Sequence, residues 1–240
     1  MSIQIILLAG HAGAGKSLLA SRLAERHGYT RLSFATPLKA LEAEAYKTWV
    51  DASANLRRNS PCFFVPCARF LIYLEEFLNP DRLISDFDHS RKLAVDLMDA
   101  ILSFYARNVL TDKKHRNALQ FIGTDVFRNT VSKMFWVNIA IEKIRDAVNS
   151  QRGRPDHFFV FDDVRFPEEL QIDPRIDACP AVTTSIYLIR TDQPPAADEH
   201  ESETAIAPTD CEHVIEHATV AELMKKAERI LWMTGLGDMK

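Results

Sequence analysis

The chain has little glycine and cysteine, and it carries no excess of positive charge. Among its 240 residues there are 8 glycines and 4 cysteines, and the formal net charge is −4 at pH 7. A protein that holds nucleic-acid backbones needs a basic surface, and this composition offers none. We therefore expect a nucleotide as the ligand rather than a polymer, and no nucleic-acid partner.

Long apolar runs are also missing. No stretch of about 18 apolar residues occurs, which argues against a membrane-spanning helix. The N-terminus lacks the basic start and the small-residue cleavage site of a secretory signal. These absences predict a cytoplasmic protein without a membrane partner. The length and the 47% hydrophobic content suit one α/β domain with insertions.

The cysteines and histidines do not form a complete metal-binding pattern. Cys62 and Cys67 flank Phe-Phe-Val-Pro and would make half of a zinc site. No second pair with ligand spacing follows, which favours reduced thiols, the usual cytosolic state. His213 and His217 are four residues apart, but the sequence between them is typical of a strand, so a helical metal pair is disfavoured.

Three of the few glycines fall within residues 10–17, which read Gly-His-Ala-Gly-Ala-Gly-Lys-Ser. This is a complete G-x-x-x-x-G-K-[ST] phosphate-binding loop. It follows the apolar run 3–9, which is typical of a strand buried on both faces, and it precedes apolar residues at helical spacing over 18–27. Strand, loop and helix therefore come in the order that a phosphate site needs, because loop amides and the helix dipole point at phosphate oxygens.

The residues of this loop have separate predicted roles. Its glycines allow a tight turn and a close approach of the backbone to an anion. Lys16 is expected to reach the β- and γ-phosphates of a nucleotide, and the Ser17 hydroxyl to bind Mg²⁺. The predicted ATP-binding segment consists of Gly10, His11, Ala12, Gly13, Ala14, Gly15, Lys16, Ser17 and Leu18.

Apolar periodicity predicts strands that alternate with helices along the rest of the chain. Further strands are expected at 29–34, 157–161, 184–189 and 213–216, and helices at 37–49, 91–109, 114–122, 136–148 and 219–233. Thr36-Pro37 is a helix start signal, and Thr219 with Glu222 forms a capping box. Residues 51–90 suggest a less regular insertion with one short helix. Residues 191–210 suggest a surface loop, either a mobile cover or a linker. The alternation predicts a five-stranded parallel sheet covered on both faces.

A second group of polar residues follows the apolar segment 158–161. Asp162 and Asp163 end this predicted strand. Ligands bind at the carboxyl ends of parallel strands, so a carboxylate here would support Mg²⁺ beside the loop. The alternative is that these acids are solvated or cap a helix. Arg165 would either face negative oxygens or pair with one of the two glutamates at 168 and 169.

Four ordered segments of the chain form a further pattern. They are Phe-Ala-Thr-Pro-Leu-Lys at 34–39, Leu-Gln-Phe-Ile-Gly-Thr-Asp-Val-Phe-Arg at 119–128 with Trp-Val at 136–137, Asp-Val-Arg-Phe-Pro-Glu-Glu at 163–169, and His-Glu-Ser-Glu at 200–203. Together they resemble the phage-type deoxynucleoside monophosphate kinases. Glu168 stands where asparagine is common in that family, Ser17 where many members carry aspartate, and the insertion around Cys62 has no counterpart. The resemblance covers 51–110 poorly.

The resemblance implies a fold and a reaction. The fold is a three-layer P-loop NTPase of the nucleoside monophosphate kinase type, one domain over 1–240 with a mostly helical acceptor-binding insertion at about 36–150. The reaction is transfer of the γ-phosphoryl group of ATP, with Mg²⁺, to a deoxynucleoside 5′-monophosphate. The location would then be the host cytoplasm if the protein is phage-encoded, and a homodimer is compatible with the family.

By similarity, individual residues receive roles in that reaction. Lys39, Arg128 and Arg165 would serve the acceptor phosphate and the transferred group, and Asp163 would orient the waters of the metal or the acceptor. Gln120 either reads the acceptor base through its amide or is a surface glutamine. The remaining candidates are Thr124 at the acceptor and Arg190 at the ATP.

Other functions of phosphate-loop proteins fit the sequence less well. Phosphomevalonate kinase and dephospho-coenzyme A kinase are related enzymes with other acceptors, but Asp-Val-Arg-Phe-Pro-x-Glu and Gly-Thr-Asp-x-x-Arg argue against both. A GTP-driven switch needs an Asn/Thr-Lys-x-Asp element, and none occurs. A nucleic-acid-stimulated ATPase should show a basic face. The sequence leaves the preferred base open.

Overall fold

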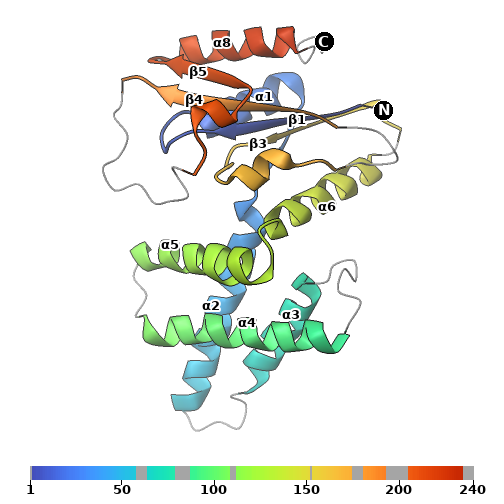
Figure 1. The fold of residues 1–240 in the computed structure, drawn as a ribbon. Helices are drawn as coiled ribbons and strands as arrows, with labels where there is room; N and C mark the ends of the chain where they lie inside the picture. Colours follow the sequence, from blue (N-terminus) through green and yellow to red (C-terminus); the bar gives the residue numbers. More distant parts are fainter. Residues whose placement is uncertain are drawn as a thin grey trace. The chain divides into compact units, whose positions relative to one another are not determined.

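A computed structural model describes residues 2–57, 64–78, 87–108, 112–151, 153–174, 181–192 and 205–234 (Figure 1). The chain divides into two compact units. We call Met1–Ala35 with Met134–Lys240 the sheet unit, and Thr36–Lys133 the helical unit. Each unit is described by itself.

The sheet unit is built on five parallel strands in the order β2-β3-β1-β4-β5. The central strand pairs on both sides, with Leu7 opposite Phe161 and Ala9 opposite Tyr187. The predicted five-stranded parallel sheet and the α/β fold class are thereby confirmed. The strands are β1 (Ser2–Ala9), β2 (Thr30–Leu32), β3 (Asp156–Phe161), β4 (Ala181–Arg190) and β5 (His213–His217).

Helices cover this sheet through apolar stripes. Leu19 and Leu23 of one helix and Leu223 and Leu231 of another pack into one core with residues of the sheet such as Ile6. A third helix buries a stripe of its own, which includes Trp136. The helical elements of the unit are α1 (Lys16–His27), α6 (Phe135–Ser150), α8 (Val220–Met233) and the 3-10 turns η3 (Pro167–Gln171) and η4 (Pro208–Asp210).

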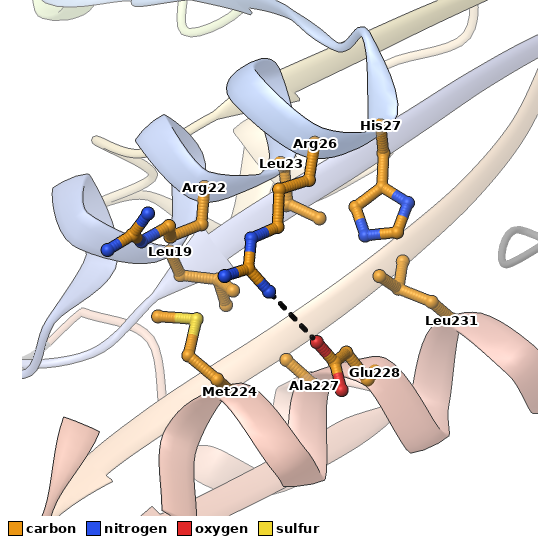
Figure 2. A pocket seen from close by; sticks show the side chains of 9 residues that line it. All are labelled: Leu19, Arg22, Leu23, Arg26, His27, Met224, Ala227, Glu228 and Leu231. Atoms are coloured by element: carbon orange, nitrogen blue, oxygen red, sulfur yellow. Dashed lines mark ion pairs between the residues drawn. The ribbon is translucent and has the colours of Figure 1, made fainter. Parts of the chain in front are cut away.

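A groove runs between α1 and α8 (Figure 2). Its apolar lining includes Leu19 and Met224, and at its rim the Arg26 guanidinium lies 3.7 Å from the Glu228 carboxylate. The two partners are more than half exposed, so this ion pair adds little stability. None of the residues that line the groove is a predicted site residue.

The helical unit contains more helix than the sequence predicted. The first helix starts two residues before Pro37, and most of the described part of 51–90, expected to be irregular, lies in long helices. Pro66 did not prevent this, because it lies in the first turn of its helix, where the missing N–H has no intrahelical partner. The helices are α2 (Ala35–Arg57, whose first residue belongs to the sheet unit), α3 (Phe64–Leu78), α4 (Phe87–Arg107) and α5 (Asp112–Gln120).

A π-helix, η2 (Phe121–Val131), continues α5 and was not predicted. Its wider turn is visible in the bond from the Ser132 amide to the Phe127 carbonyl, which spans five residues at 3.1 Å. Gly123 lies against Leu38 of α2, and a Cβ on this glycine would be 2.7 Å from a methyl group of that leucine. Such helices are rare and are frequently found at functional sites.

The core of the helical unit encloses a polar contact that the sequence did not reveal. One carboxylate oxygen of the buried Glu42 accepts a hydrogen bond from the Tyr105 hydroxyl at 3.0 Å and lies 2.8 Å from Nδ1 of His115. Tyr46 packs edge-on to the His115 ring. A buried carboxylate needs such partners, because an unsatisfied one would be costly. The contact links α2, α4 and α5.

Several local predictions can be compared with this structure. Thr219 caps α8 as expected, with its hydroxyl accepting the Glu222 amide at 3.2 Å, and the Glu222 carboxylate accepts hydrogen bonds from the backbone amides of Ala218 and Thr219. Cys67 is partly buried, which raises the pKa of its thiol. Cys62 and residues 193–204 of the expected loop lie outside the described residues.

The described residues also bear on metal binding and on membranes. Within those ranges, no three side chains of histidine, cysteine, aspartate or glutamate gather as a metal site. No helix in the described part of the chain is long and apolar enough to cross a membrane.

The packing of Gly10, which follows β1, against β4 can be tested by substitution. Gly10 has φ 126°, and a Cβ there would be 2.3 Å from the Leu188 carbonyl oxygen of β4. Backbone atoms cannot move aside, so Gly10→Ala should lower the free energy of unfolding by about 3 kcal/mol. The control is Gly153→Ala at φ 104° with open space around it, for which about 1 kcal/mol is expected. Equal losses in urea unfolding would contradict the packing argument.

Candidate active site

The phosphate loop joins β1 to α1 and has the backbone that an anion site needs. Gly15 precedes the helix with φ 90° and has no side chain with which to cap it. The first amides of a helix lack intrahelical partners and carry the positive end of its dipole. The loop therefore presents N–H groups where a phosphate group would gain from both effects.

Lys16 and Ser17 begin helix α1. The Lys16 ammonium donates hydrogen bonds to the carbonyl oxygens of Gly10 and His11, the second at 2.8 Å. The lysine is thus held across the loop by the backbone of the loop itself. Ser17 and Leu18 are exposed.

The two carboxylates that follow β3 have separate structural partners. Asp162 pairs with Arg31 of β2 at 2.7 Å. Asp163 accepts from the Ser33 hydroxyl at 2.6 Å and from the amides of Phe34 and Ala35 at 3.1 and 2.8 Å. Asp163 therefore caps helix α2 from a distant part of the chain, in place of the start signal predicted at Thr36-Pro37.

Arg165 lies two residues after this cap and is exposed. Its backbone amide donates to the Glu169 carboxylate at 2.6 Å, and the Phe166 amide donates to the same oxygen at 3.1 Å. Glu169 is buried. Its carboxylate therefore fixes the backbone from which the Arg165 side chain projects.

Arg190 ends β4, two strands from β3. Its guanidinium forms a two-pronged contact with the Asp192 carboxylate, at 2.7 and 3.0 Å. This contact raises the pKa of Arg190 and lowers the pKa of Asp192. A phosphate or base would have to compete with this carboxylate for the arginine.

The other predicted site residues belong to the helical unit. Lys39 is exposed on α2, whereas the remaining three are partly buried. Gln120, Thr124 and Arg128 are spaced four residues apart, from the end of α5 into the π-helix. A spacing of four is close to one helical turn, so these three side chains share one side of the element. In the sheet unit, strand pairing places the phosphate loop and Asp162–Arg165 at the same edge of the sheet.

The chain was compared with known families. The sequence profile of the family described as deoxynucleotide monophosphate kinase matches residues 71–227, more than half of the chain. The chain belongs to this family. It is a kinase of nucleotide metabolism. No curated protein sequence matches it.

The family match and the phosphate loop are independent observations. The match begins in α3, so the loop at 10–17 and Lys39 lie outside it. The matched segment contains Gln120, Thr124 and Arg128, together with Asp163, Arg165 and Arg190. The glycine-rich motif at 10–17 therefore did not contribute to the family assignment.

Two further residues contact the backbone of the candidate site, and the sequence analysis did not identify them. Glu169 had a detectable signal, because Pro167 with a glutamate two residues later is typical of the first turn of a helix. His217 had none. Its Nε2 lies 3.0 Å from the Ala14 carbonyl oxygen of the loop, across 203 residues of sequence. Such a contact follows from the tertiary fold alone.

Glu169 gives the kinase a predictable pH dependence. Burial raises the pKa of this carboxyl to about 8 from its ordinary value of 4.5. The backbone amides of Arg165 and Phe166 both donate their hydrogen bonds to Oε2. Oε1 can therefore carry the proton without loss of either hydrogen bond. Between these two pH values the folded state then binds more protons than the unfolded state, and the free energy of unfolding falls as pH rises.

Glu169→Gln keeps an accepting oxygen but cannot ionise. It should remove this part of the pH dependence, which amounts to at least about 1 kcal/mol between roughly pH 5 and 8. Urea unfolding across that range measures the effect, with Glu168→Gln as the control that retains the wild-type slope. Identical slopes in wild type and Glu169→Gln would refute the assignment of this proton.

Proposed function

We propose that this kinase transfers the γ-phosphoryl group of ATP to the 5′-phosphate of a deoxynucleoside monophosphate. The products are ADP and the deoxynucleoside diphosphate. The observation that carries the proposal is the complete phosphate loop, which lies outside the segment that matches the family and at the same edge of the sheet as Asp163 and Arg165 within it. Two independent parts of the sequence thus support one reaction.

The donor half of the proposed site is the loop with the start of α1. Its amides bind the β- and γ-phosphates, and Lys16 supplies a positive charge to them. Phosphate oxygens would take over the lysine contacts now made by the carbonyls of Gly10 and His11. Arg190 is the further candidate of the sheet unit for binding ATP.

Mg²⁺ is the metal that the donor atoms of this site fit. Mg²⁺ prefers hard oxygen ligands and keeps several waters, so it needs few protein groups beside the phosphates. Here these groups are the exposed Ser17 hydroxyl and the carboxylate of Asp163, whose oxygens also hold the start of α2. When bound, the ion would neutralise charge on the β- and γ-phosphate oxygens.

The acceptor half of the proposed site draws on cations and amides of the helical unit. Lys39 and Arg128 would neutralise the acceptor phosphate, Thr124 would donate a hydrogen bond to it, and Gln120 would contact the base through its amide. Arg165 would serve the group in transfer.

The transfer itself requires little covalent chemistry from the protein. An oxygen of the acceptor phosphate forms a bond to the γ-phosphorus, while the bond from that phosphorus to the bridging oxygen breaks and its electron pair leaves with ADP. Both reactants are polyanions, so positive charge must be concentrated where they meet. Lys16, Arg128 and Arg165 are the residues proposed for this role.

The reaction is tested by ADP release with a panel of acceptors. Deoxynucleoside monophosphates, including modified pyrimidines, should support turnover, whereas ribonucleotides, phosphomevalonate and dephospho-coenzyme A should not. Lys16→Ala should lower kcat at least ~10²-fold, since electrostatic stabilisation of this kind is worth that much, and it also controls for contaminating kinases. Absence of turnover on every deoxynucleotide would reject the proposal.

The acceptor half is tested with a pair of lysines on α2. Lys39→Ala should raise KM for the acceptor about tenfold or more and leave KM for ATP unchanged, because a charge that contacts only the acceptor phosphate is lost. Lys47→Ala is the matched control, since Lys47 is an exposed lysine on the same helix and lies 3.9 Å from the Glu44 carboxylate. Equal acceptor KM values for the two variants would remove Lys39 from the site.

A further inference from the structure

His217, the last residue of β5, contacts the phosphate loop from the buried side of the loop. Only 5% of His217 is exposed to solvent. The Nε2 of its ring lies 3.0 Å from the carbonyl oxygen of Ala14. A carbonyl oxygen can only accept a hydrogen bond, so Nε2 must carry the proton and donate. The loop is therefore bonded to a strand that lies far away in sequence.

The neighbouring glycine shows how closely the loop is packed at this point. A Cβ on Gly15 would be 2.9 Å from a methyl carbon of Leu223 and 3.7 Å from Cε1 of His217. Leu223 is a buried residue of α8. The histidine ring and the leucine together fill the space under the turn from loop to helix.

The backbone of His217 is fixed as well. Its carbonyl oxygen accepts the Thr191 amide at 2.9 Å, one residue after Arg190. Two residues later, Thr219 caps α8. With its main chain held on both sides and its ring buried, the imidazole has little freedom to leave the Ala14 carbonyl.

The direction of this bond determines where a loop amide points. In a trans peptide unit, the carbonyl of one residue and the N–H of the next point in opposite directions. The Ala14 carbonyl points inward to the buried imidazole, so the Gly15 N–H points outward, away from the core. An outward N–H in this loop is a donor for phosphate oxygens.

We propose that His217 is a positioning residue, which orients the Ala14–Gly15 peptide so that the Gly15 amide faces the phosphates of ATP. The inference rests on the proposed binding of ATP at this loop. It assigns to the C-terminal strand a part in donor binding that the loop motif does not include. The histidine does not touch the nucleotide and acts through the backbone.

Nucleotide binding without an acceptor tests this role. Titration calorimetry with Mg-ATP and Mg-ADP should show that His217→Leu, which keeps bulk but loses the donor, weakens both about tenfold. His217→Gln should restore most of the affinity, because its amide nitrogen can reach the same carbonyl. His157→Leu is the matched control, a buried histidine at the opposite end of a strand of the same sheet, and should bind as wild type.

The outcomes separate this role from a general packing role and from the proposed function. Wild-type affinity in His217→Leu, or equal losses in His217→Leu and His217→Gln, would overturn the inference. If His217→Leu does not fold, His217→Asn replaces it, since the shorter amide cannot reach Ala14 and should bind more weakly than His217→Gln. Failure of the wild type itself to bind either nucleotide would instead reject ATP as the donor.

Discussion

The pairing of β1 with a parallel strand on each side is the constraint on which the rest of the sheet unit depends. Because all three strands run in the same direction, their carboxyl ends meet at one edge, and the segments that follow them meet there too. The phosphate loop follows β1, Asp162 and Asp163 follow β3, and Arg190 ends β4. Close packing of β1 against β4 also explains why residue 10 must be glycine, since the Leu188 carbonyl occupies the place of a side chain.

Much of this arrangement could be predicted from local sequence. The apolar runs, the glycine loop and the capping box at Thr219 each involve residues near one another in the chain, and the parallel sheet follows from their alternation. Prediction failed where distant residues decide the structure. Helix α2 begins at Ala35 because Asp163 supplies its cap, and no local pattern around Thr36 contains that information. The π-helix likewise follows an ordinary helical pattern, and its wider turn depends on packing such as that of Gly123 on Leu38.

The site residues divide in the same way. Lys16 and Ser17 could be chosen from a motif whose spacing has a chemical reason, and Arg165 from resemblance to a family. Glu169 and His217 contact backbone atoms of the candidate site, the first at Arg165 and the second at Ala14, and neither belongs to a ligand-binding motif. Buried residues of this kind are invisible to motif searches because their partners are main-chain atoms, which every residue has.

The order of the strands has a consequence for self-association. The strands at the two edges, β2 and β5, have three and five residues, whereas the internal β4 has ten. Short edges offer few unpaired backbone groups to a second chain, and exposed charges at Arg31 and Glu216 oppose an approaching strand. The sheet that carries the phosphate loop is thus protected against edge-to-edge aggregation.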